Sequence, residues 1–183
     1  MDPISDFNPF QSIKALLILD ENAKRLFGRY YDSDLFPNNR DCHKFEQTLL
    51  RRNKKTLDSN DEIIDHFENY TVVARAAIDV YIFVIGDESE NELTLNYLLG
   101  SIMEALNSIT MQGQMLDKSQ IMQNYSKVLI IFDEAVSDNG VLLEANSNRL
   151  IDRITEDRPV QITEDEMLNE IGNQTFKFFK SLM

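Results

Sequence analysis

Cysteine is nearly absent from this chain of 183 residues, which contains only Cys42. No disulfide can form within the chain, and this fits a reducing compartment. Long apolar runs are also missing, since none approaches the roughly 18 residues of a membrane-spanning helix. The N-terminus lacks the basic and apolar regions of a secretory signal, and Asp2 stands where myristoylation requires glycine. The sequence predicts neither a membrane span nor a lipid anchor.

Positive charge is scarce, with 18 Lys and Arg residues against 31 Asp and Glu residues and a net charge of −13. An acidic surface repels the phosphates of nucleic acids and anionic lipids, so neither is expected as a default partner. The hydrophobic fraction of 43% and the charged fraction of 27% are ordinary for a globular protein. The length favours one domain with extensions.

The residue types that catalysis and metal binding need are few and scattered. The two histidines, His43 and His66, are expected on the surface, where histidine titrates without doing chemistry. The phosphate-binding patterns G-x-x-x-x-G-K-[ST] and G-x-G-x-x-G and the nucleophile elbow G-x-S-x-G are all absent. One cysteine and two separated histidines do not form a tetrahedral zinc pattern. We therefore expect no enzyme activity and no catalytic, cofactor-binding or metal-binding residue.

The strongest pattern in the sequence lies between Ile78 and Ile109. Val80–Ile85 contains only β-branched and aromatic residues, which is typical of a central strand covered on both faces. Ser89–Glu92 then has the form of a helix capping box. Apolar residues follow at helical spacing: Leu95, Leu98, Leu99, Ile102, Leu106 and Ile109. Gly100 costs this helix about 1 kcal/mol relative to alanine, and we expect it to allow close packing on the strand.

The remaining strands and helices are predicted from apolar alternation and helical spacing. The expected strands are Ile13–Leu19, Arg25–Tyr31, Ile63–Phe67 and Tyr70–Ala77. Short helices are expected at Asp41–Arg51 and around Leu150–Ile154. The second strand is more exposed than the first, as at a sheet edge. Short turns between consecutive strands predict an antiparallel meander with helices on its faces, an α+β sandwich.

Two segments allow more than one interpretation. Val128–Phe132 alone has the pattern of a strand, but Ile121–Val136 keeps helical spacing without a break, so a largely buried helix is predicted. It should end near Asn139 or Gly140, one of which supplies a left-handed residue. Arg51, Arg52, Lys54 and Lys55 either solvate the end of the first helix or bind an acidic partner or a phosphoinositide.

Several stretches, taken in order, resemble a known family. These are the Ile13–Tyr31 hairpin, Lys44–Glu46, Ile78–Tyr81, Glu90–Leu93, Phe132–Glu134 and Asp138–Glu144. Their order is similar to that of the zeta subunits of coatomer. Asn91–Leu93 and the signature that runs from Asp133 and Glu134 to Gly140 also resemble the sigma subunits of clathrin adaptors. The resemblance covers about 11–154. It leaves 1–10, which contains Pro3 and Pro9, as a flexible arm and 155–183 as a linker and tail.

The resemblance implies a longin-like (profilin-like) fold, with five antiparallel strands between helices. It implies a structural, non-enzymatic subunit of the coatomer vesicle coat that pairs with the gamma large subunit in Golgi-to-ER and intra-Golgi transport. Contact with an Arf-family GTPase and with the Golgi membrane would then be indirect, through the complex, and the location cytoplasmic. The alternatives are a sigma-type subunit that binds acidic dileucine signals and a longin-like regulator of a small GTPase.

Apolar residues in expected surface loops are the candidate partner-binding residues: Leu35, Phe36, Val141, Leu142 and Leu143. A partner helix that covered them would stabilise the chain. The tail has a second capping box at Thr163–Glu166, followed by apolar residues at spacings of three and four. We therefore predict a C-terminal helix from about Glu164 to Leu182, which docks on its own domain, on another coat subunit or at a membrane surface.

Overall fold

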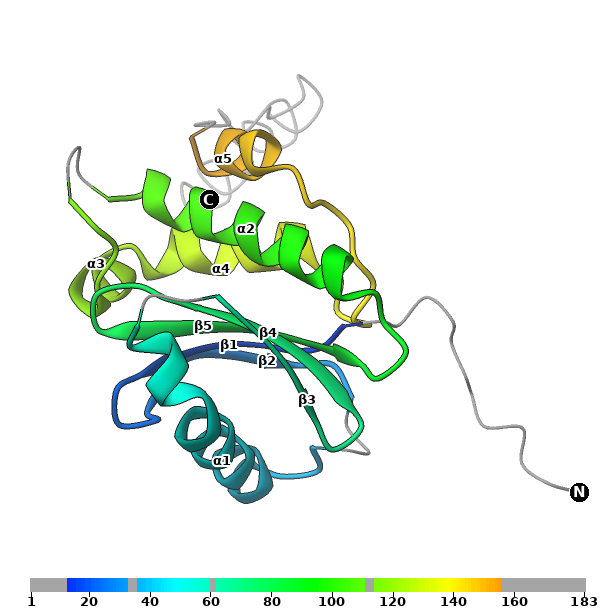
Figure 1. The fold of residues 1–183 in the computed structure, drawn as a ribbon. Helices are drawn as coiled ribbons and strands as arrows, with labels where there is room; N and C mark the ends of the chain where they lie inside the picture. Colours follow the sequence, from blue (N-terminus) through cyan, green and yellow to red (C-terminus); the bar gives the residue numbers. More distant parts are fainter. Residues whose placement is uncertain (1–12, 33–35, 60–61, 111–113, 156–183) are drawn as a thin grey trace, which may run out of the picture.

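The computed structural model describes residues 13–32, 36–59, 62–110 and 114–155. A five-stranded antiparallel sheet lies between helices (Figure 1). The strands are β1 (Ile13–Asp20), β2 (Arg25–Tyr30), β3 (Ile63–Phe67), β4 (Tyr70–Ala76) and β5 (Val80–Asp87). The helices are α1 (Asn39–Leu57), α2 (Glu92–Ser108), α3 (Lys118–Gln123), α4 (Tyr125–Ala135) and α5 (Ser147–Thr155). The predicted α+β sandwich is confirmed, while the predicted helix at Glu164–Leu182 lies outside the described residues.

The strand order is β2-β1-β5-β4-β3, so β5 is central and β2 lies at an edge, as predicted. The simple meander is wrong, because the first strand pairs with the last, with Leu17 opposite Phe83. The reason is the path of α1, which carries the chain from β2 across one face of the sheet (Figure 1). β3, β4 and β5 then return from the far edge towards β1.

The side chains of β5 alternate between two hydrophobic cores. Val80, Ile82 and Val84 belong to the core that includes α2, α4 and α5, whereas Tyr81, Phe83 and Ile85 belong to the core under α1. All six side chains are buried. A strand buried on both faces follows from the period of two, and it confirms the prediction for Val80–Ile85.

Both long helices begin at an asparagine cap. The Asn38 side chain accepts hydrogen bonds from the amides of Arg40 and Asp41, so α1 starts earlier than expected. It also continues to Leu57, and the basic run lies within the helix rather than after it. At α2 the Asn91 side chain accepts from the amide of Leu93 at 2.9 Å.

The capping box predicted at Ser89–Glu92 is wrong. The hydroxyl of Ser89 donates to Asp87 at 2.8 Å, and the Ser89 amide donates to the same carboxylate at 3.1 Å. Asp87 thus binds both groups that the capping box would have used. The helix begins after the next available polar side chain, Asn91.

The segment predicted as one buried helix at Ile121–Val136 is helical, but it is divided at Asn124 into α3 and α4. The Asn124 side-chain amide donates to the carbonyl of Gln120 at 3.0 Å, and this local bond ends the first helix. Gly140 has φ 73°, which confirms a left-handed residue at the predicted position.

Candidate interaction surface

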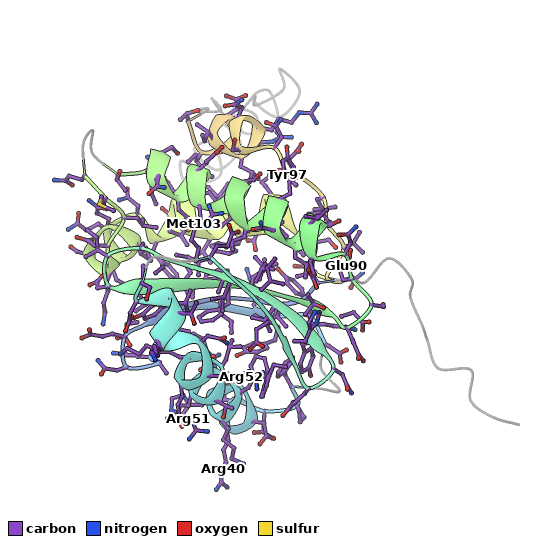
Figure 2. All side chains as sticks on the ribbon, in the orientation of Figure 1. Arg40, Arg51, Arg52, Glu90, Tyr97 and Met103 are labelled. Atoms are coloured by element: carbon purple, nitrogen blue, oxygen red, sulfur yellow. The ribbon has the colours of Figure 1, made fainter. Side chains whose placement is uncertain are left out.

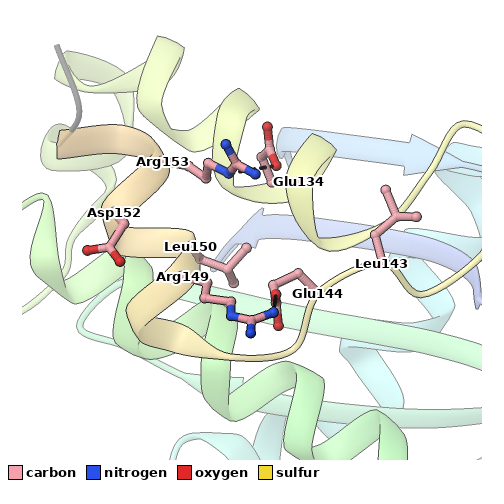
Figure 3. A pocket seen from close by; sticks show the side chains of 7 residues that line it. All are labelled: Glu134, Leu143, Glu144, Arg149, Leu150, Asp152 and Arg153. Carbon is pink, nitrogen blue, oxygen red and sulfur yellow. Dashed lines mark hydrogen bonds and ion pairs between the residues drawn. The ribbon is translucent and has the colours of Figure 1, made fainter. Parts of the chain in front are cut away.

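A hollow of about 530 Å³ lies between α4, α5 and the segment that joins them (Figure 3). It is lined by Glu134, Leu143, Glu144, Arg149, Leu150, Asp152 and Arg153. α5 holds its position because Leu150 is fully buried in the core beside α2 and α4. The exposed side of α5 therefore contributes Arg149, Asp152 and Arg153 to the hollow.

Two ion pairs cross this hollow, and Figure 3 shows both. Arg149 donates to Glu144 at 3.0 Å, and Arg153 lies 3.3 Å from Glu134. The hydrogen bond from Arg149 lowers the pKa of Glu144 below its usual range. The lining contains no histidine, cysteine or hydroxyl group. Paired charges beside apolar side chains are typical of the polar rim of a protein interface rather than of a catalytic site.

The residues predicted to bind a partner have different surroundings. Leu143 is 59% exposed at the edge of the hollow, whereas Val141 and Leu142 are half-buried. Leu142 pairs with Val136 in an isolated β-bridge and packs against the core. The structure therefore brings the 141–143 segment to the surface chiefly through Leu143.

Phe36 does not add to this surface. Phe36 is buried, with its ring centroid 4.6 Å from that of Tyr30 and 5.1 Å from that of Phe45. The expectation that Phe36 is a surface residue is wrong, because these rings form the end of the core under α1. Leu35 lies outside the described residues.

Sequence reasoning missed an apolar stripe on α2. Leu93 is 73% exposed and Tyr97 is 63% exposed, one helical turn apart. Gly100 continues the stripe, and a Cβ built there meets no heavy atom within 4 Å. The expected close packing of Gly100 on the sheet is therefore wrong.

We call Leu93, Tyr97 and Gly100 the α2 stripe, and α2 also contacts the segment that follows Leu143. Ser101, one turn after Tyr97, donates its hydroxyl proton to the carbonyl of Ala145 at 2.5 Å. Figure 2 shows Tyr97 on the side of α2 that faces away from the sheet. The spacing of 93, 97 and 100 was the available signal, since it lies opposite the buried residues of α2.

Neither a membrane helix nor a metal cluster is found in the described ranges. None of their helices combines the length and the apolar character needed to cross a bilayer. Within the same ranges, no group of three or more His, Cys, Asp or Glu residues could hold a metal ion. His66 contacts Glu92 at 2.9 Å on the surface, and His43 is also exposed.

Comparison with known proteins identifies relatives over most of the chain. It is 33% identical to human coatomer subunit zeta-1 over 143 residues, which covers 78% of this chain and 76% of the relative. It is 35% identical to the coatomer zeta subunit of Saccharomyces cerevisiae, with 79% and 77% covered. The probable coatomer subunit zeta-A of Dictyostelium discoideum is 26% identical, with 92% and 97% covered.

The fold comparison agrees with these relatives. A chain in a homology model of the full-length AP-3 complex matches with a TM-score of 0.53 at 16% identity, covering 90% of this chain and 98% of that one. At this identity the match shows the fold alone, and it supports the longin-like architecture. Residues 12–160 match the family model for the clathrin adaptor complex small chain. The chain belongs to this family of coat adaptor subunits, and within it resembles the coatomer zeta subunits.

Proposed function

We propose that this chain is the small structural subunit of a coatomer-type vesicle coat, in which it pairs with the gamma large subunit. It works without catalysis and without a cofactor, in Golgi-to-ER and intra-Golgi transport. Its place is cytoplasmic, on Golgi membranes and coated vesicles, where it is held through the rest of the coatomer complex. Its contact with an Arf-family GTPase is indirect.

The observation that carries this proposal is the similarity to coatomer zeta subunits, at 33% to 35% identity in human and yeast, over more than three quarters of the chain. The lining of the α4–α5 hollow supports a binding role rather than catalysis, since its two ion pairs lie beside Leu143. The match to the clathrin adaptor small-chain family is compatible with the sigma-type alternative as well, but the relatives reported above at 33% and 35% identity are coatomer zeta subunits.

We assign the contact with the large subunit to the α2 stripe together with Leu143. Tyrosine and leucine at this exposure supply apolar area that a helix of the partner can bury, and aromatic residues are enriched in interface centres. The charged residues around the α4–α5 hollow then form a polar rim.

Purification of the tagged full chain from its native cells tests the assignment to a coat. Copurification of the coatomer gamma subunit is the expected result. Copurification of clathrin-adaptor large subunits would instead support the sigma-type role, and recovery of a small GTPase alone would support the regulator.

A double variant tests the surface. Leu93→Ser with Tyr97→Ser should weaken copurification of gamma by about tenfold or more, because two exposed apolar anchors are lost. The matched control is Met115→Ser with Met122→Ser, which changes two side chains that are 69% and 55% exposed elsewhere. Equal loss in both variants would contradict the assignment of the α2 stripe.

A further inference from the structure

A row of cations runs along the outer side of α1. Arg40, Lys44, Arg51 and Lys55 lie at i, i+4, i+11 and i+15, so their side chains leave the helix within one narrow sector. All four are exposed. We call these four residues the α1 ridge, and at 1.5 Å per residue it extends for about 22 Å.

The α1 ridge lies opposite the side of the helix that binds the sheet. That buried side consists of Cys42, Phe45, Glu46, Leu49, Leu50, Asn53 and Leu57. α1 is the one described helix on its face of the sheet, and in Figure 2 Arg40 and Arg51 project away from the body of the protein. No other helix of the described ranges therefore covers the ridge.

Few anions neutralise the α1 ridge. Lys44 has a weak contact with Asp41 at 3.4 Å, and within the described ranges no ion pair is found for Arg40, Arg51 or Lys55. Arg52, just outside the ridge, already binds Asp65 at 2.6 Å. The whole helix has six basic residues and two acidic ones, one of which, Glu46, is fully buried. The α1 helix is therefore positively charged, although the whole chain has a net charge of −13.

We propose that the α1 ridge docks an acidic helical segment of a partner protein, with glutamate or aspartate spaced to meet the four cations. Oppositely charged side chains on two adjacent helices bring the charges within salt-bridge distance, and arginine binds carboxylates with two hydrogen bonds. This docking site does not rest on the proposed pairing with gamma, because it lies on the opposite face of the sheet.

A protein segment fits the α1 ridge better than an anionic membrane does. The ridge and its neighbours His43 and Gln47 have no apolar side chain to insert into a bilayer. A flat lipid surface would also approach other parts of a chain whose net charge is −13. A helix can approach the ridge alone, within the Debye length of about 10 Å at 0.1 M salt.

The test uses the full chain and two fluorescent helical peptides of equal composition. One has glutamates at i, i+4, i+11 and i+15, and the other has them spread around the helix. The ridge variant is R40Q/K44Q/R51Q/K55Q. The control K24Q/R29Q/R75Q/K127Q removes two Arg and two Lys elsewhere, and thermal melts check that both variants fold.

We expect the full chain to bind the peptide whose glutamates lie at i, i+4, i+11 and i+15, with an affinity that falls as the salt concentration rises. The ridge variant should bind this peptide about tenfold or more weakly. The control should stay within about twofold of the unmodified chain. Equal binding of both peptides, or equal loss in both variants, would overturn the proposal. Ridge-dependent binding to phosphatidylserine or phosphoinositide vesicles without peptide binding would assign the ridge to a membrane instead.

Discussion

The two faces of the sheet are built in different ways. Among the described helices, α1 alone covers one face, and its outer side is polar and basic. The other is covered by α2, α4 and α5, and its outer side exposes Leu93, Tyr97 and Leu143. The first face suits electrostatic contact that salt screens, and the second suits burial of apolar area. The two proposed surfaces thus suit partners of different chemistry.

The inner sides of the two faces also differ. Under α1 the core contains a fully buried carboxylate, Glu46, which is 2.5 Å from Arg25 and accepts a hydrogen bond from Tyr30 at 2.8 Å. Burial and this hydrogen bond raise the pKa of Tyr30. Under α2 and α4 the packing is apolar, with the rings of Phe27 and Phe132 stacked at 4.1 Å. The comparison leads to four predictions.

Truncation of either core should have the largest effect. Phe83→Ala, on the α1 side, and Phe132→Ala, on the α2 side, should each cost about 3–5 kcal/mol, because both side chains are fully buried. That is a large share of a total stability of about 5–15 kcal/mol. Urea denaturation measures both, with exposed Ile78→Ala as the control. A Phe83 variant of native stability that lost only partner binding would show that β5 is not the structural centre.

Loss of the buried carboxylate should come next. Glu46→Ala should cost about 3 kcal/mol, because Arg25 and Tyr30 would lose a charged partner in a largely buried site. Glu46→Gln should cost less, since its carbonyl still accepts from Tyr30. On the other face, Ser101→Ala removes one neutral hydrogen bond and should cost about 1 kcal/mol. If Glu46→Ala cost no more than Ser101→Ala in urea denaturation, the contrast between the two cores would fail.

A third prediction concerns acid stability where α3 meets β1. Burial acts to raise the pKa of Asp20. Hydrogen bonds from Lys118 and from the amides of Lys24 and Asn22 lower it by more, so the pKa lies below its usual range. A lowered pKa stabilises the fold above about pH 4, and this contribution is lost as the pH falls through the folded-state value. Asp20→Asn should cost about 2 kcal/mol at pH 7 and less at pH 2. Denaturation at several pH values measures this, and a cost independent of pH would contradict it.

The smallest effect should be a gain. Gly100→Ala should stabilise the chain by about 0.5–1 kcal/mol, because alanine favours the helix and its Cβ meets no neighbour. Gly86→Ala is the opposing control, since its Cβ would come within 2.8 Å of Leu95. Calorimetric melts measure both. A Gly100 variant that melts higher but loses the large subunit would place the α2 stripe in the interface, and one that melts lower would contradict the open surface.

Local periodicity explains which parts of the fold were predictable. Val80–Ile85 lies in a strand buried on both sides, and Leu95, Leu98 and Leu99 lie on the buried side of α2. These patterns depend on neighbours a few residues apart, which the sequence contains directly. Helix ends were less predictable, because Ser89 and Asn91 can both cap and the choice depended on Asp87.

The candidate surface was predictable only in part. Leu143 was found from an apolar run in an expected loop, but Phe36 came from the same reasoning and is buried. Leu93 and Tyr97 were missed, because α2 has apolar residues on more than one side. Periodicity alone does not decide which of those sides faces the sheet.

The sequence by itself determined the type and order of most elements, the central place of Val80–Ile85 and the similarity to a known family of coat subunits. Tertiary structure alone decided that β1 pairs with β5, that Glu46 is buried with Arg25, and that Leu93 and Tyr97 face outward. The physical reason is range. Alternation and capping act between residues close in sequence, whereas strand order and exposure depend on where α1 and α2 carry the chain.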